Sequence, residues 1–220
     1  MLHRTLHAPG SVLLGLCVAL TASCDRDDRE FPTAASPAGV IGELSAGAQT
    51  SNGDVVVAAD DPSGTGPAIG TVVGQSHLTR NHKGLRANVR TSGLTPGDVV
   101  TMWITTFQNP DGCDGACDIP PEDFPGGLGS TQVAGAAIVP NNGRLGIAGK
   151  LDVGDEVVFG GMFGGPVVQV FDNPFGSEVH LVVRTHGPPI PGRLDEQMSL
   201  FPGGCDENAC ENIQVALYEP

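Results

Sequence analysis

The sequence predicts an all-β domain of about nine or ten strands, either an antiparallel β-sandwich of immunoglobulin-like or jelly-roll-like type or a β-barrel. Glycine contributes 32 and proline 18 of the 220 residues, and charged residues make up only 16% of the chain. This composition favours short strands joined by tight turns. Short runs with period-two hydrophobicity recur between turn signals from about residue 51 onward, and each must bury one face against another sheet.

The turn signals place the individual strands. Residues 81–84 suit a hairpin connection, and in the arm that follows Leu85, Ala87 and Val89 alternate with polar residues. Pro96 and Gly97 favour a turn before the run that holds Trp103, which we expect in the core. Asn142-Gly143 favours a tight hairpin turn. The predicted strands are 54–59, 69–79, 85–91, 99–107, 130–139, 145–151, 157–159, 167–171, 178–186 and 213–218.

The first 23 residues have the pattern of an export signal. Arg4 precedes an apolar run, residues 11–22, that has the length of a signal-peptide core and is too short to span a bilayer. Thr21-Ala22-Ser23-Cys24 resembles the lipobox of bacterial lipoproteins, which implies a lipid on Cys24. The sequence therefore predicts export to the cell envelope and a membrane anchor, with simple secretion as the alternative.

The odd number of cysteines after residue 23 also supports a lipid on Cys24. Without residues 1–23 the chain keeps Cys24 and four further cysteines. An exported protein rarely keeps a spare thiol, so a lipid on Cys24 leaves four cysteines for two disulfides. Residues 24–50, rich in Ala, Gly, Ser and Pro, are expected to form a flexible tether ahead of a single domain, residues 51–220.

The four remaining cysteines lie in two Gly-rich loops. Cys113 and Cys117 are close in sequence, as are Cys205 and Cys210. Two local disulfides are the first choice, although crossed bridges between the loops and a four-cysteine zinc site are also compatible with the sequence. The first loop gathers carboxylates at Asp111, Asp114, Asp118, Glu122 and Asp123. Carboxylates suit calcium, but their spacing matches no known calcium loop, so a solvated acidic loop is the first interpretation and calcium the alternative.

A polar stripe runs along residues 178–186. Strand alternation places two faces along this run: Glu178, His180, Val182, Arg184 and His186 on one, and Val179, Leu181 and Val183 on the other. Imidazoles beside a carboxylate could bind copper or zinc, but His180 and His186 are about 20 Å apart on an extended strand and cannot share an ion without a bend. The first interpretation is therefore that both histidines are partly exposed on the wet face of an antiparallel sheet, with a metal site as the alternative.

The sequence resembles a group of uncharacterised bacterial exported proteins over most of residues 70–220. The likeness rests on SGLTPGD at 92–98, Trp103, Cys113, EVHLVVRTHGP at 178–188 and the Cys205 loop. His186-Gly187-Pro188 after a strand is also similar to the ending of the chordin-type (CHRD) domain. These resemblances imply a β-domain and no particular reaction.

Charge and missing motifs narrow the function. The net charge of −14 is unfavourable for binding nucleic acid, and the basic residues Arg80, Lys83, Arg86 and Arg90 look scattered. The sequence lacks the common hydrolase, metalloprotease, phosphate-loop and dinucleotide motifs, so no cofactor is expected. We expect a non-catalytic, structural or protein-binding envelope module. Metal binding is the alternative, and a hydrolase using His180 or His186 as base is a more distant one.

Overall fold

The described part of the chain consists of ten strands, one short helix and connecting turns. The structure, a computed structural model, describes residues 47–58, 70–113, 117, 129–159 and 167–220. The described residues all belong to one compact unit. Its elements are β1 (Gln49–Val57), β2 (Val72–Asn81), β3 (Gly84–Thr91), β4 (Val99–Phe107), the 3-10 turn η1 (Pro110–Gly112), β5 (Gly129–Ile138), β6 (Leu145–Asp152), β7 (Glu156–Phe159), β8 (Val167–Val170), β9 (Glu178–Thr185), α2 (Leu194–Ser199) and β10 (Glu211–Tyr218).

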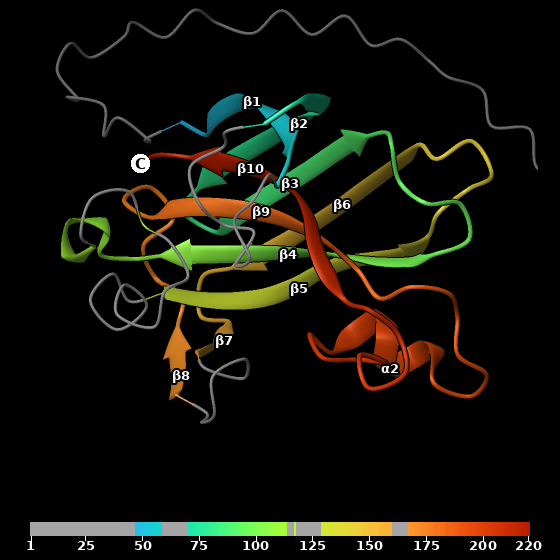
Figure 1. The fold of residues 1–220 in the computed structure, drawn as a ribbon. Helices are drawn as coiled ribbons and strands as arrows, with labels where there is room; N and C mark the ends of the chain where they lie inside the picture. Colours follow the sequence, from blue (N-terminus) through green and yellow to red (C-terminus); the bar gives the residue numbers. More distant parts are fainter. Residues whose placement is uncertain (1–46, 59–69, 114–116, 118–128, 160–166) are drawn as a thin grey trace, which may run out of the picture. The chain divides into compact units, whose positions relative to one another are not determined.

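Eight of these strands curve into a nearly closed antiparallel barrel (Figure 1). Their order is β6-β3-β2-β1-β10-β9-β4-β5, and β7 and β8 continue the sheet beyond β5 through the single pair Thr131–Val158. Strands β5 and β6 face each other at the edge where the barrel nearly closes. Their backbones lie close together there: a Cβ atom added at Gly149 of β6 would lie 2.4 Å from the Cβ atom of Ala134 of β5. The predicted all-β fold is confirmed, and its architecture is the barrel alternative.

The connection between β5 and β6 differs from the tight hairpin that Asn142-Gly143 predicted. A turn does form, since the Gly143 amide donates to the Pro140 carbonyl over 2.9 Å and Gly143 has a φ of 65°. The flanking backbone, however, pairs with the preceding turn, as the Val139 amide donates to Asp98 over 2.8 Å and Leu94 donates to Gly143 over 3.2 Å. These bonds widen the connection, and β6 makes its ladder with β3 instead.

Apolar side chains from all eight barrel strands fill the interior. Leu78, Leu85, Met102, Leu151 and Leu181 are among the fully buried ones. Burial of one such side chain contributes roughly 1.5–3 kcal/mol. The alternation predicted for residues 85–91 is confirmed, because Leu85, Ala87 and Val89 all lie in this cluster.

A second apolar cluster lies on the outer face of β4, β9 and β10. Trp103, Val182 and Val215 form it, and Phe201 from the segment after α2 packs against them. The Trp103 and Phe201 rings meet edge to face with centroids 5.2 Å apart. Residues 187–210 therefore cover this outer surface of the barrel, which explains why Trp103 is buried, as predicted, although it does not point into the barrel.

Candidate functional site

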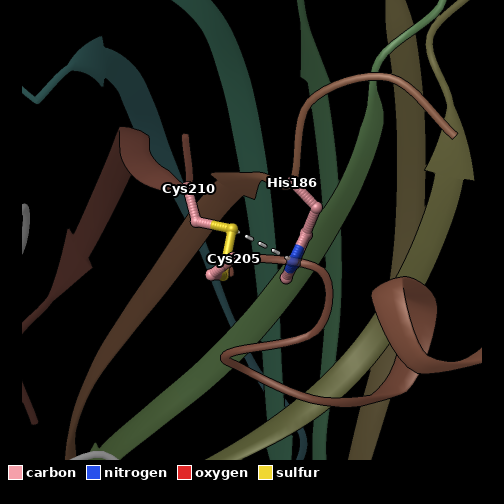
Figure 2. Close-up of side chains that lie close together, drawn as sticks. All are labelled: His186, Cys205 and Cys210. Atoms are coloured by element: carbon pink, nitrogen blue, oxygen red, sulfur yellow. Dashed lines mark hydrogen bonds between the residues drawn. A yellow bond between two sulfur atoms is a disulfide. The ribbon is translucent and has the colours of Figure 1, made fainter. Parts of the chain in front are cut away.

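The closest gathering of reactive side chains lies where residues 187–210 meet the barrel. His186 follows the last residue of β9, and Cys205 and Cys210 lie in the loop between α2 and β10 (Figure 2). The two cysteines form a disulfide, and the Cys210 sulfur lies 3.8 Å from Nδ1 of His186. His186 is fully buried, whereas both cysteines are partly exposed.

Hydrogen bonds fix the tautomer of His186. Nδ1 lies 2.8 Å from the carbonyl oxygen of Gly203, which can only accept, so Nδ1 carries the proton. Nε2 is then an acceptor, and the Thr101 hydroxyl donates to it over 2.9 Å while receiving the Trp103 indole N–H over 2.7 Å. Both ring nitrogens are thus satisfied by a neutral imidazole.

The buried neutral imidazole predicts a pH-dependent stability. Desolvation, opposed by the bond to Gly203 and assisted by Arg184, lowers the pKa of His186. Below about pH 6.5 the unfolded chain then binds a proton that the folded one does not, so stability falls as pH falls, by at most about 1.4 kcal/mol per pH unit. Urea unfolding between pH 8 and pH 5 should show this slope. His186→Gln should flatten it, whereas a matched change at the exposed His82, His82→Gln, should not.

Arg184 of β9 joins the barrel to residues 187–210, which we call the covering segment and which contain the Cys205–Cys210 disulfide. Its Nε donates to the Phe201 carbonyl over 3.0 Å, and one Nη donates to the Asn212 side-chain oxygen over 2.9 Å. The other Nη lies 3.8 Å from the Cys205 sulfur, and the guanidinium carbon is 3.9 Å from the centroid of the Phe201 ring. Burial lowers the pKa of Arg184 to about 10, so the side chain is still cationic at neutral pH.

His186, Cys205 and Cys210 are the strongest metal-ligand candidate in the described part of the chain. Nδ1 of His186 and the sulfurs of Cys205 and Cys210 all lie within 4.8 Å of one another. A metal ion would require thiolates and a free imidazole lone pair. The disulfide would therefore have to be reduced and the bond from Nδ1 to Gly203 broken. In the oxidised protein the cluster fastens residues 187–210 to the end of β9.

The histidines of β9 lie in different surroundings from those expected. The first interpretation, partly exposed histidines on a wet sheet face, is wrong, because His180 and His186 are both 0% exposed. Nε2 of His180 lies 2.7 Å from a Glu178 carboxylate oxygen, and its ring packs against Phe107 with centroids 5.1 Å apart. His186 instead bonds Thr101, so the two histidines belong to separate sites. Among the described residues Nδ1 of His180 has no hydrogen-bond partner.

Both local disulfides are present. Cys113 pairs with Cys117, and Cys205 pairs with Cys210. This confirms the first-choice connectivity and is incompatible with a four-cysteine zinc site. Two disulfides indicate an oxidising compartment outside the cytoplasm. In the acidic loop Asp111 is exposed, whereas Asp114, Asp118, Glu122 and Asp123 lie outside the described residues, so the calcium interpretation stays a prediction.

Two buried polar residues escaped the sequence reasoning. Arg80 is 2% exposed and lies in phase with Ser76 and Leu78 on the inward side of β2. That alternation was the signal that could have identified it. Gln197 of α2 is also buried and bonds the backbone of residues 186, 188 and 190, which holds the covering segment in place. Its neighbours in sequence give no comparable signal.

Comparisons with protein-family models, curated proteins and solved structures gave no match. None of the helices within the described residues is long and apolar enough to cross a membrane.

Proposed function

We propose that the chain is an exported lipoprotein that displays a non-catalytic β-barrel at the cell envelope. Residues 1–23 direct export, Cys24 carries the lipid, and the residues between Cys24 and the start of β1 at Gln49 form the tether. The membrane is its first partner, through the lipid. The barrel is a structural or binding module held away from that membrane.

The cysteine pairing carries this proposal. The two disulfides use four of the five cysteines that follow residue 23, and each pair is closed within its own loop. Cys24 is the cysteine left over, and a thioether-linked lipid would give it a stable covalent state in an oxidising compartment.

The surroundings of the barrel histidines support a non-catalytic role. His186 uses both ring nitrogens to connect β4 with residues 187–210, and His180 contacts Glu178 beneath the Phe107 ring. Neither has a hydroxyl nucleophile activated towards an open cleft, the arrangement that acyl-transfer enzymes need. The interior of the barrel is filled by apolar side chains and supplies tight packing for a stable displayed module.

The tether is tested by cell fractionation of the full chain expressed in a bacterium. Wild-type protein should partition into Triton X-114 detergent and sediment with membranes. Cys24→Ala should move to the aqueous phase, because it lacks the lipid acceptor, and globomycin should leave the wild type unprocessed. Cys17→Ala is the matched control, since Cys17 lies within the signal, and should fractionate like wild type. Detergent partition of a processed Cys24→Ala variant would contradict the anchor.

A further inference from the structure

The outward face of β1, β2, β3 and β6 is polar and follows the strand register. Asn52, His77 and Asn88 are register partners on consecutive strands and form one outward row. Asp54, Gln75 and Arg90 are partners in the next row, where the Gln75 amide donates to an Asp54 carboxylate oxygen over 2.6 Å, so this row carries one acid beside its arginine. Partners in an antiparallel sheet share a face, so these side chains form a continuous surface, which we call the polar face together with Arg144.

Small residues of β6 hollow out this face. Gly146 lies opposite Arg90, and Ala148 lies opposite Asn88. One hollow, of about 490 Å³, is lined by Arg90, Arg144 and Gly146 among others. A second, of about 360 Å³, is lined by Asn52, His77, Asn88 and again Arg90. Arg90 lines both hollows, so its side chain borders each of them.

The polar face concentrates the exposed positive charge of an acidic protein. Among the described residues every exposed Lys or Arg lies on β3, β6 or the turns next to them, although the whole chain has a net charge of −14. Arg86 and Lys150 share Asp152. Arg90 and Arg144, by contrast, have no carboxylate partner within the described ranges, so their charge is available to an anion. This corrects the expectation of scattered basic residues.

Arg90 and Arg144 are placed to act together. Arg144 immediately precedes β6, Arg90 lies opposite Gly146 of that strand, and both arginines line the hollow of about 490 Å³. A guanidinium can bind a carboxylate or sulfate through two parallel hydrogen bonds. The pair therefore suits a ligand with two acidic groups a short distance apart.

The rest of the polar face favours a hydroxyl-rich chain over a membrane or a protein. Amide and imidazole groups of Gln75, His77 and Asn88 offer both donors and acceptors. Outward positions of β3 and β6 carry no large apolar side chain, whereas membrane-surface and protein interfaces rely on such residues. A groove of this composition fits a polysaccharide that bears carboxylate or sulfate groups.

We propose that the polar face binds an acidic polysaccharide, with Arg90 and Arg144 each contacting an acidic group and Asn52, His77 and Asn88 contacting hydroxyls along the chain. The inference rests on the proposed function of the barrel as a displayed binding module, and it names the class of partner. It does not require the lipid on Cys24, so the two proposals can fail separately.

The test uses the full chain, purified in detergent, and measures binding to immobilised polygalacturonate and heparin, with neutral dextran as the reference surface. We expect binding to the two acidic polymers, weakening with salt, and none to dextran. Arg90→Gln/Arg144→Gln should weaken binding at least about tenfold, which corresponds to about 1.4 kcal/mol, because both cationic contacts to the acidic groups are lost. Both side chains are exposed, so the fold should be unchanged.

The matched control is Val170→Glu/Leu200→Glu, which changes the net charge by the same −2 at exposed positions away from the polar face. It should bind like wild type after allowance for a small long-range effect. An equal loss in this control would assign binding to net charge and overturn the proposal, as would unchanged binding of Arg90→Gln/Arg144→Gln. Binding to phosphatidylglycerol vesicles but to neither polymer would assign the face to lipid. Failure to bind the polymers while Cys24→Ala still releases the protein would overturn the polysaccharide and leave the anchor standing.

Discussion

Replacing Arg80 by methionine should lower the free energy of unfolding by about 3–5 kcal/mol, because several buried backbone carbonyls lose their charged donor. The guanidinium donates to four backbone carbonyls, those of Pro174, Ser177, Tyr218 and Glu219, at 3.0, 2.6, 3.3 and 2.9 Å. It therefore joins β2 to the turn before β9 and to the end of β10. Methionine fills part of the volume but leaves these acceptors unpaired, and each unpaired buried acceptor costs roughly 1–3 kcal/mol.

The cost of burying the Arg80 cation partly offsets this expected loss of stability. Burial lowers the pKa of Arg80, partly offset by Tyr218, which shows that desolvation of the cation has a free-energy cost. Removing the charge recovers that cost, so the net effect is smaller than the sum of four bonds. Arg80→Lys should recover only part of the stability, because an ammonium has three donors and lacks the planar fork.

Urea unfolding followed by tryptophan fluorescence measures the effect through the midpoint at constant m value. Arg86→Met is the matched control, since Arg86 is exposed and its pair with Asp152 lies at the surface, where an ion pair contributes roughly 0–1 kcal/mol. If Arg80→Met and Arg86→Met unfold at the same midpoint, the four carbonyl bonds contribute little and the account of Arg80 is wrong.

Local information was enough to predict the strands and the disulfides. Alternation with Gly and Pro turns gave ten runs, and each coincides with one of the ten strands, with ends that shift by a few residues; β1, for example, begins at Gln49. The cysteine pairs closed as their sequence proximity favoured. In both cases the determining contacts lie within one short segment, so the sequence pattern contains them.

The residues that surround β9 could not be predicted from the local sequence. Its alternation correctly separated Leu181 and Val183, which point into the barrel, from Val182 and Arg184. Nothing within the strand shows that residues 187–210 fold back over its outer face and bury His186 against Gly203. The choice between sandwich and barrel was open for the same reason, because it depends on β5 meeting β6 rather than on any single strand.

Gly149 is the position where that meeting can be tested, and Gly149→Ala should cost about 2–3 kcal/mol, near the upper end of the range for overpacking. An added Cβ would lie 2.4 Å from both the Cβ and the carbonyl oxygen of Ala134, and 2.7 Å from its carbonyl carbon. Because two of these atoms are backbone, no rotamer change can make room. Strands β5 and β6 would have to separate, and the interior packing beside them would loosen.

Gly146→Ala, three residues earlier in the same strand, separates this steric effect from the general effect of replacing a glycine. A Cβ there would have its nearest neighbour, the Val89 carbonyl oxygen, at 4.0 Å. The change should be neutral or stabilise by up to about 1 kcal/mol, because alanine has less conformational entropy to lose on folding. If Gly149→Ala lowers the midpoint of urea unfolding while Gly146→Ala leaves it unchanged or raises it, β5 lies against β6 at Gly149. Equal midpoints would mean that the barrel is open at this edge, and a two-layer sandwich would then describe the domain better.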